Sequence, residues 1–114
     1  MENIENLPNE KWRPITGYKG KYLVSDQGRI KSLKHLKPHI LKAFINNKGY
    51  ARVALCKDGK SHHFLVSRLV AQAFCPNPDP EHANTVDHID GNTQNNSARN
   101  LRWMTLTDNV RAYF

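Results

Sequence analysis

Residues 85–114 read TVDHIDGNTQNNSARNLRWMTLTDNVRAYF, and this pattern decides the fold of the second half of the chain. Residues 85–89 are rich in β-branched side chains, which favour a strand. The Asp-Gly-Asn sequence at 90–92 favours a turn, and an asparagine-rich loop follows it. Residues 101–104 then resume an extended pattern. The stretch therefore predicts two antiparallel strands joined by a long polar loop.

A helix is predicted directly after the second strand. Thr105 is a favourable N-cap residue, and Asp108 follows at the spacing of a capping box. The helix is expected to run from about Leu106 to the end of the chain. The predicted order of elements is therefore strand, loop, strand, helix.

The residue types in this stretch suit metal-assisted hydrolysis of a phosphodiester. A histidine such as His88 can take a proton from water, because its reference pKa is about 6.5. A hard cation such as Mg²⁺ stabilises charge on the phosphate, and it needs few protein ligands because it keeps several waters. Asp87 offers an anionic oxygen, and Asn109 on the predicted helix offers a neutral one. We expect the hairpin and the helix to bring these two side chains together.

The chain before this stretch predicts small antiparallel sheets and one helix. Short extended segments alternate with glycine-containing polar turns, as in β-hairpins. The expected strands are residues 22–25, 29–33, 41–46, 50–55 and 63–65, with a basic linker at 34–39. Residues 66–75 predict a packing helix with one apolar face, which the prolines at 76, 78 and 80 end.

These elements predict an α+β protein with small N-terminal antiparallel β-sheets. We expect a flexible tail at residues 1–9, a basic β-rich module at 10–65, the helix and a proline-rich crossover at 66–83, and a strand–loop–strand–helix core at 84–114.

The net charge of +7 is unevenly distributed along the chain. Residues 1–10 sum to −3, residues 11–68 to +12 and residues 69–114 to −2, which together give +7. Lysine and arginine can neutralise DNA phosphates, although a charge run alone is more typical of a solvated surface. The residues expected to contact DNA are Arg13, Lys19, Lys21, Arg29, Lys31, Lys34, Lys37, Lys48, Arg52, Arg68 and Arg102.

Several other kinds of protein are disfavoured. No apolar run approaches the roughly 20 residues of a membrane span, and the polar N-terminus does not read as a secretion signal, so we expect a cytoplasmic protein. Cys56 and Cys75 have no CxxC partner, which argues against a zinc ribbon. An EF-hand starting at Asp87 fails because Gly91 comes one position early and Ala98 replaces the closing glutamate.

The motifs D-H-I-D-G-N, N-N, N-L-R-W and D-N resemble the HNH endonuclease superfamily, most closely the intron-encoded and free-standing homing endonucleases of phages. The resemblance implies a ββα-metal (HNH) nuclease core holding one Mg²⁺ or Mn²⁺. It implies that Asp87 and Asn109 bind the metal and that His88 is the general base. It implies that Asn100 braces both the loop and His88, and that the products carry 5′-phosphate and 3′-hydroxyl ends.

A second resemblance concerns the basic part of the chain. The segments EKWRPI at 10–15, VSD at 24–26 and GRIKSL at 28–33 resemble the NUMOD-type module that often precedes HNH cores and binds DNA. The resemblance covers about residues 10 to 110. There are two departures. Ser67 stands where many relatives have histidine, and the chain stops at Phe114, whereas related nucleases often continue into a further helical module.

The sequence therefore predicts a monomeric, metal-dependent endonuclease that acts on double-stranded DNA, with no membrane association. A single centre of this kind cuts one strand at a time, so we expect nicking. The alternative is a DNA-binding module, or a decayed nuclease, that grips DNA without cutting it. The nuclease hypothesis requires the Asp87 and Asn109 side chains to lie close together and His88 to be open to solvent.

Overall fold

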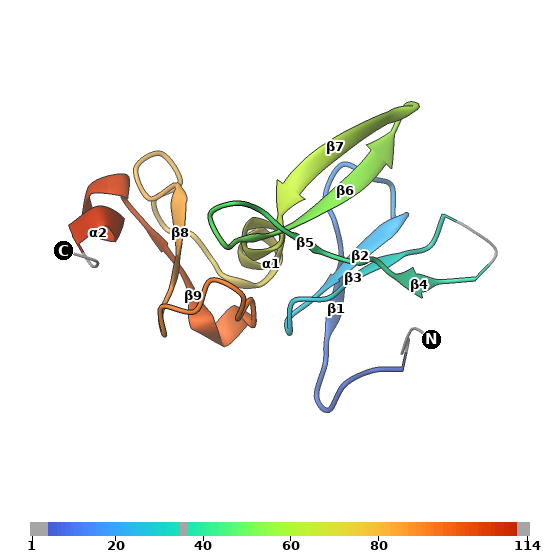
Figure 1. Cartoon of the computed structure of the whole chain (residues 1–114), viewed down its shortest axis with the longest axis horizontal. Coiled ribbons are helices and arrows are strands. Elements are labelled where there is room, and N and C mark those ends of the chain that lie inside the picture. Colours follow the sequence, from blue (N-terminus) through green and yellow to red (C-terminus); the bar gives the residue numbers. More distant parts are fainter. Residues whose placement is uncertain (1–4, 35–36, 112–114) are drawn as a thin grey trace.

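In the part of the chain that the structure describes, three antiparallel sheets lie around a central helix (Figure 1). The computed structural model describes residues 5–34 and 37–111, with side chains up to Asp108. In Figure 1 the helix α1 (Val66–Phe74) lies between the N-terminal sheets on one side and the C-terminal hairpin on the other. Among the described residues, no helix has the length and apolar character required to span a bilayer.

The first sheet has the order β1-β2-β3-β4. Its strands are β1 (Trp12–Pro14), β2 (Tyr22–Ser25), β3 (Ile30–Ser32) and β4 (His39–Ile40). The turn between β2 and β3 is tight, because Gly28 adopts a φ of +90° and the Ser25 hydroxyl accepts the N–H groups of Gln27 and Arg29. Val24 on β2 faces Ile30 on β3, and both are buried.

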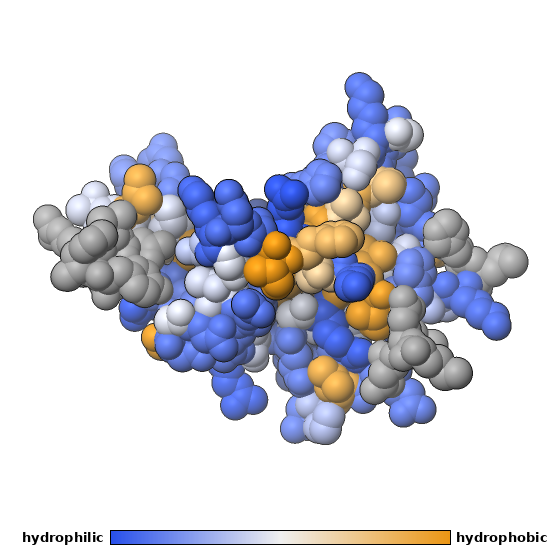
Figure 2. Space-filling view, in the orientation of Figure 1, coloured by the Kyte–Doolittle hydropathy of each residue, from blue (hydrophilic) through white to orange (hydrophobic). Residues whose placement is uncertain are grey.

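The second sheet has the order β5-β6-β7. Its strands are β5 (Phe44–Ile45), β6 (Ala51–Lys57) and β7 (Lys60–Leu65). Alternate residues of β6, namely Ala51, Val53 and Leu55, point into the core, as the period of a strand requires. On β5, by contrast, Phe44 and Ile45 are exposed, and Figure 2 shows a hydrophobic patch over this strand on a mostly hydrophilic face.

The helix α1 joins these sheets to the C-terminal part. It packs against β2, β6 and β7 on one side and against β8 (Thr85–His88) and β9 (Leu101–Met104) on the other. Its buried residues Val66, Leu69, Val70 and Ala71 belong to the same core as Val53 and Leu55. One continuous core therefore fixes the position of the hairpin relative to the basic sheets.

The C-terminal hairpin has the predicted order of elements. Between β8 and β9 lie the polar loop and a short 3-10 helix, η1 (Ala98–Asn100), and α2 (Leu106–Arg111) follows β9 and packs against β8. The Thr105 hydroxyl accepts the N–H of Asp108 at 3.1 Å, so the predicted N-cap is confirmed. The expected continuation of the helix to the chain end lies outside the described residues.

The predicted strand at 41–46 is too long, because only Phe44–Ile45 forms a strand, β5. Ile40 pairs with Lys31 in the first sheet, whereas Phe44 pairs with Arg52 in the second, so the chain changes sheets between β4 and β5. The predicted basic linker likewise ends early, because His39 already belongs to β4. An extended apolar pattern reports local conformation but not the partner strand, so it does not show that one strand ends at Ile40 and the next begins only at Phe44.

Candidate active site

Asp87 and His88 are the last two residues of β8, and each is only 3% exposed. Their side chains start on opposite faces of the strand, as its period requires. Across the hairpin, Asp87 faces Arg102 and His88 faces Leu101 of β9. The pairing with β9 therefore fixes both backbones, and the side chains are then held by different neighbours.

Asp87 carries a buried carboxylate next to a cationic group. Its Oδ2 accepts a hydrogen bond from Nε of Arg102 at 2.8 Å, and the Arg102 side chain is 50% exposed. We predicted Arg102 as a DNA contact, but the structure places it against the predicted metal ligand. Its guanidinium balances the negative charge that burial would otherwise make costly.

His88 lies between a tyrosine ring and an amide. Its Nε2 is 2.8 Å from Oδ1 of Asn96, and the centroids of its ring and that of Tyr50 are 5.9 Å apart. With an amide oxygen as its partner, Nε2 carries a proton, and in the neutral ring Nδ1 then carries the lone pair. Our expectation of a solvent-open His88 is wrong, because Asn96 and Tyr50 lie against the ring.

Asn100 braces the loop between β8 and β9. Its Nδ2 donates to Oδ1 of Asp90 and to the Asn95 carbonyl, both at 2.9 Å, and its Oδ1 accepts the Asp90 N–H at 3.0 Å. The resemblance assigned two tasks to Asn100, bracing the loop and holding His88. The structure gives it contacts for the first, but the atom that accepts the hydrogen bond from Nε2 of His88 is Oδ1 of Asn96.

The carboxyl of Asp90 is the centre of this loop. Hydrogen bonds from the Asn95 side chain, the Asn92 N–H and the Asn100 side chain hold its pKa below the ordinary value. Asp90 is therefore a structural carboxylate whose hydrogen bonds are used within the loop.

Asn109 lies on α2, which packs against β8, but its side chain is outside the described residues. The predicted meeting of the Asp87 and Asn109 side chains thus stays a prediction. Within the described ranges, no group of three or more histidine, cysteine, aspartate or glutamate side chains could hold a metal ion. A Mg²⁺ or Mn²⁺ ion held by one carboxylate and one amide does not need such a group, because waters and phosphate oxygens complete its coordination. The buried, charge-balanced carboxylate of Asp87 fits that donor set.

Sequence reasoning missed Asn96 and Tyr50 as neighbours of His88. Asn96 belongs to the N-N motif that carried the family resemblance, but no role was assigned to it. Tyr50 comes from the start of β6, and its approach depends on the β5–β6 turn, where the Gly49 carbonyl accepts the Thr93 hydroxyl at 2.6 Å. No local pattern could have indicated either contact.

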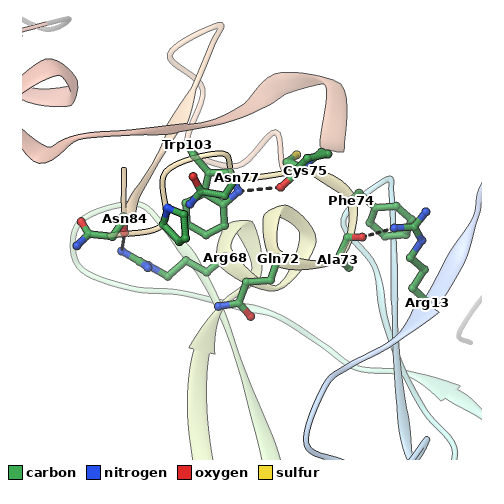
Figure 3. Close-up of a pocket in the computed structure, with 11 residues that line it drawn as sticks. Arg13, Arg68, Gln72, Ala73, Phe74, Cys75, Asn77, Asn84 and Trp103 are labelled. Carbon is green, nitrogen blue, oxygen red and sulfur yellow. Dashed lines mark hydrogen bonds between the residues drawn. The ribbon is translucent and has the colours of Figure 1, made fainter. Parts of the chain in front are cut away.

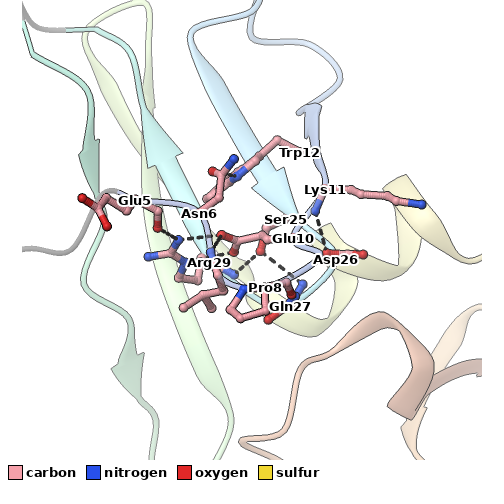
Figure 4. A network of polar contacts seen from close by, with 11 residues as sticks. Glu5, Asn6, Pro8, Glu10, Lys11, Trp12, Ser25, Asp26, Gln27 and Arg29 are labelled. Carbon is pink, nitrogen blue, oxygen red and sulfur yellow. Dashed lines mark hydrogen bonds and ion pairs between the residues drawn. The ribbon is translucent and has the colours of Figure 1, made fainter.

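The predicted DNA-contacting residues differ in how far the fold itself uses them. Arg29 is used within the fold: it donates to both carboxylate oxygens of Glu10, at 2.6 and 2.9 Å, and to the Glu5 carbonyl at 2.7 Å (Figure 4). We therefore withdraw Arg29 from the proposed DNA contacts. The following predicted residues are exposed: Arg13, Lys19, Lys21, Lys34, Lys37, Lys48 and Arg52.

Two of the predicted arginines line a cleft of about 600 Å³ beside α1 (Figure 3). Arg13 donates to the Ala73 carbonyl and lies over the Phe74 ring, and Arg68 donates to the Asn84 carbonyl at 2.9 Å. The lining of this cleft includes neither Asp87 nor His88.

Lys31, the remaining residue of the set, is half-buried with its ammonium 4.1 Å from the centroid of the Trp12 ring.

The Glu10–Arg29 pair predicts acid sensitivity. Burial raises the pKa of Glu10, but hydrogen bonds from Arg29, the Leu7 N–H and Ser25 outweigh it and bring the pKa from 4.5 to about 2. A lowered folded-state pKa stabilises the protein above about pH 4.5, and this contribution is lost as the pH falls towards 2. Glu10→Gln should destabilise the protein by about 2 kcal/mol at neutral pH. Urea unfolding at several pH values measures this. The free energy of unfolding of the variant should also fall less than that of the parent as the pH is lowered from about 4.5 towards 2.

The exposed Glu81 provides the control for this measurement. Glu81→Gln should leave both the stability and its pH dependence unchanged. If Glu10→Gln is as stable as the parent at neutral pH, the buried pair does not hold the N-terminal segment to the sheet.

Comparisons with known proteins show which families the chain resembles. Residues 10–56 match the NUMOD4 motif, and residues 64–111 match the HNH endonuclease family. The chain is 46% identical over 100 residues to DNA endonuclease I-HmuI of Bacillus phage SP01, covering 88% of this chain and 55% of that protein. It is 34% identical over 99 residues to H-N-H endonuclease F-TflII of Escherichia phage T5, covering 87% of this chain and 50% of that protein.

A solved structure described as "DNA binding and cleavage by the HNH homing endonuclease I-HmuI" has the same fold. The TM-score is 0.81 at 43% sequence identity, over 90% of this chain and 56% of that one. The chain thus spans about half the length of these relatives. The two family matches follow each other in the predicted order and together include the basic sheets, Asp87 and His88. The chain therefore carries a NUMOD4 match followed by an HNH endonuclease match, and it is homologous to I-HmuI and other HNH endonucleases.

Proposed function

We propose that the chain is a metal-dependent endonuclease that nicks double-stranded DNA. The observation that carries this proposal is the pair of buried, adjacent side chains at the end of β8: a carboxylate balanced by a guanidinium, and a histidine whose Nε2 lies 2.8 Å from the Asn96 amide oxygen. Burying two such polar groups is costly unless they are paired, and both lie within the segment that matches the HNH endonuclease family.

In the proposed reaction, Asp87 and Asn109 hold one Mg²⁺ or Mn²⁺. When bound, this ion supplies positive charge at the scissile phosphate and at the leaving oxygen. His88 takes the proton of the attacking water at Nδ1, and Asn100 braces the loop that directly follows His88. The exposed lysines and arginines of the basic sheets neutralise phosphates along the DNA.

The burial of His88 adds a requirement to this reaction. The attacking water has to reach Nδ1, so the surroundings of the ring must open when DNA and metal bind. The nuclease hypothesis required a solvent-open His88 in the free chain, and that requirement is too strict. Contacts of a catalytic group in a free enzyme are often rearranged in the complex with substrate, so a covered ring is compatible with the role. Tyr50 is a candidate for this movement because its ring lies against His88.

A supercoiled plasmid tests the proposal against the alternative of a module that binds DNA without cutting. With Mg²⁺ or Mn²⁺ we expect conversion to the open circular form, and with EDTA we expect none. Linear product should appear only after nicks accumulate, because one monomer cuts one strand at a time. Binding in a gel-shift assay without any nicking in either metal would leave the non-catalytic module as the function.

The proposed DNA contacts make a separate prediction. Lys48 and Arg52 lie on the β5–β6 hairpin, whose turn docks on the nuclease loop through Gly49 and Thr93. Replacing both with glutamine should weaken DNA binding, and log Kd should change less steeply with log salt, by about 0.9 for each phosphate that is no longer neutralised. Binding isotherms at several salt concentrations measure this. Lys60→Gln, an exposed lysine outside the proposed set, is the control. An unchanged affinity and slope in the double variant would show that this hairpin does not contact DNA.

A further inference from the structure

We propose that Asn96 is a positioning residue that fixes the His88 ring as its Nε2–H tautomer, and that the β2–β3 turn of the N-terminal sheet holds Asn96 in place. The inference rests on the proposed role of His88 as the general base. A series of direct contacts connects the loop between β8 and β9 to the N-terminal sheet.

The first contact is the hydrogen bond itself. Nε2 of His88 and Oδ1 of Asn96 are 2.8 Å apart, and the two residues are 3% and 8% exposed. An amide oxygen can only accept, so the imidazole nitrogen facing it must carry the hydrogen. The other nitrogen, Nδ1, then carries the lone pair, which is the form of the ring that a base requires.

The second contact is between Asn96 and Gly28 in the β2–β3 turn. A Cβ atom placed on Gly28 would lie 3.2 Å from Cβ of Asn96 and 3.3 Å from its carbonyl oxygen, so the β2–β3 turn and the loop are in close contact. Gly28 also needs its φ of +90°, which other residues rarely adopt. The Asp26 carbonyl accepts the Ala98 N–H at 2.7 Å, just beyond Asn96.

The turn that provides this support is itself well held. The Ser25 hydroxyl accepts two backbone N–H groups across the turn, and Oδ1 of Asp26 accepts the Lys11 N–H at 3.0 Å. The Asp26 N–H donates to the Lys11 carbonyl at 3.0 Å. Thus a turn of the NUMOD4 segment, and not the nuclease loop alone, determines where the Asn96 amide lies.

Asn100 is poorly suited to the same task. Its Oδ1 and Nδ2 already bond Asp90 and Asn95. The two asparagines thus divide the work: Asn100 closes the loop and Asn96 orients the ring.

NMR of the metal-free, DNA-free chain labelled with ¹⁵N-histidine tests the inference directly. At about pH 8, above the ordinary histidine pKa, His88 should appear as the Nε2–H tautomer with an exchange-protected Nε2 proton. The His88→Gln spectrum identifies the signal. In Asn96→Ala, which keeps the Cβ atom that packs on Gly28, the protected proton should be lost. Asn96→Asp keeps an acceptor oxygen and should retain it.

Gly28→Ala tests the support from the N-terminal sheet, and Gln94→Ala is the control. Gly28→Ala should weaken the protection of the same proton, since the added methyl group displaces Asn96. Gln94 is an exposed residue of the same loop, and its replacement should leave the signal unchanged. A proton found on Nδ1 in the parent chain, or a signal that survives in Asn96→Ala, would overturn the proposal.

Plasmid nicking separates this inference from the proposed function. Loss of the buried hydrogen bond should lower kcat of Asn96→Ala by about 10-fold with little change in KM. If Asn96→Ala nicks at the parental rate, the positioning role is wrong although the nuclease stands. If the parent chain does not nick DNA at all, the proposed function fails, while the NMR result still decides whether Asn96 sets the tautomer.

Discussion

His88→Ala should lower the rate of plasmid nicking by about 10²-fold or more, the size of effect expected when a general base is removed. The proposed reaction has one group that takes the proton of the attacking water, and alanine cannot replace it. DNA affinity should stay close to the parental value, because the ring is buried and does not belong to the basic surface. Single-turnover nicking with saturating Mg²⁺, together with a gel-shift titration, measures both quantities.

Two further variants separate loss of the base from loss of structure. His88→Ala leaves the Oδ1 atom of Asn96 without its ring partner, and an unpaired buried acceptor destabilises a protein by about 1–3 kcal/mol. His88→Gln can still donate to this oxygen but is not a base, so it should be equally inactive and more stable. His82→Ala is the control, because His82 is an exposed histidine paired with Asp79. Nicking by His88→Gln at the parental rate would exclude His88 as the base.

The C-terminal hairpin and helix could be predicted from the sequence because each signal there is local. A β-branched run, an Asp-Gly turn and a threonine N-cap lie within a few residues of the structure they produce, and the hydrogen bond between Thr105 and Asp108 confirms the last of them. The boundary between β4 and β5 depends instead on which strand each segment pairs with. That choice is made by distant residues, Lys31 for Ile40 and Arg52 for Phe44.

The same distinction applies to the candidate site. Asp87 and His88 stand in a recognisable motif, and Asn100 braces a loop that lies next to it in sequence. The burial of His88 could not be predicted, because it arises from the β5–β6 hairpin and from a loop held against the β2–β3 turn. Arg29 is a residue whose role was predicted wrongly for the same reason. Its charge suggested a DNA contact, but its partner Glu10 is 19 positions away, and no sequence pattern connects the two.

The second large effect is expected at Asp87. Asp87→Asn keeps the size of the side chain and removes its charge, so Mn²⁺ binding should fall by about 10-fold or more, as for the loss of about 1.4 kcal/mol of electrostatic attraction or more. Nicking should fall by at least about 10²-fold, because the ion then no longer stabilises the charge that develops at the phosphate. The fold should tolerate the change, since the Arg102 side chain is half exposed and its guanidinium can be solvated by water instead.

Mn²⁺ titration of the DNA-free chain, followed by electron paramagnetic resonance, tests the role of Asp87 independently of cleavage. Asp79→Asn, which removes an exposed carboxylate with the same change of net charge, should bind Mn²⁺ like the parent. The comparison matters because Arg102 already neutralises Asp87 in the free chain, so any ion bound at this carboxylate must compete with a guanidinium. Asp87→Asn with parental Mn²⁺ affinity would mean that the carboxylate serves only to anchor Arg102. The metal, if the reaction uses one, would then have to be held elsewhere.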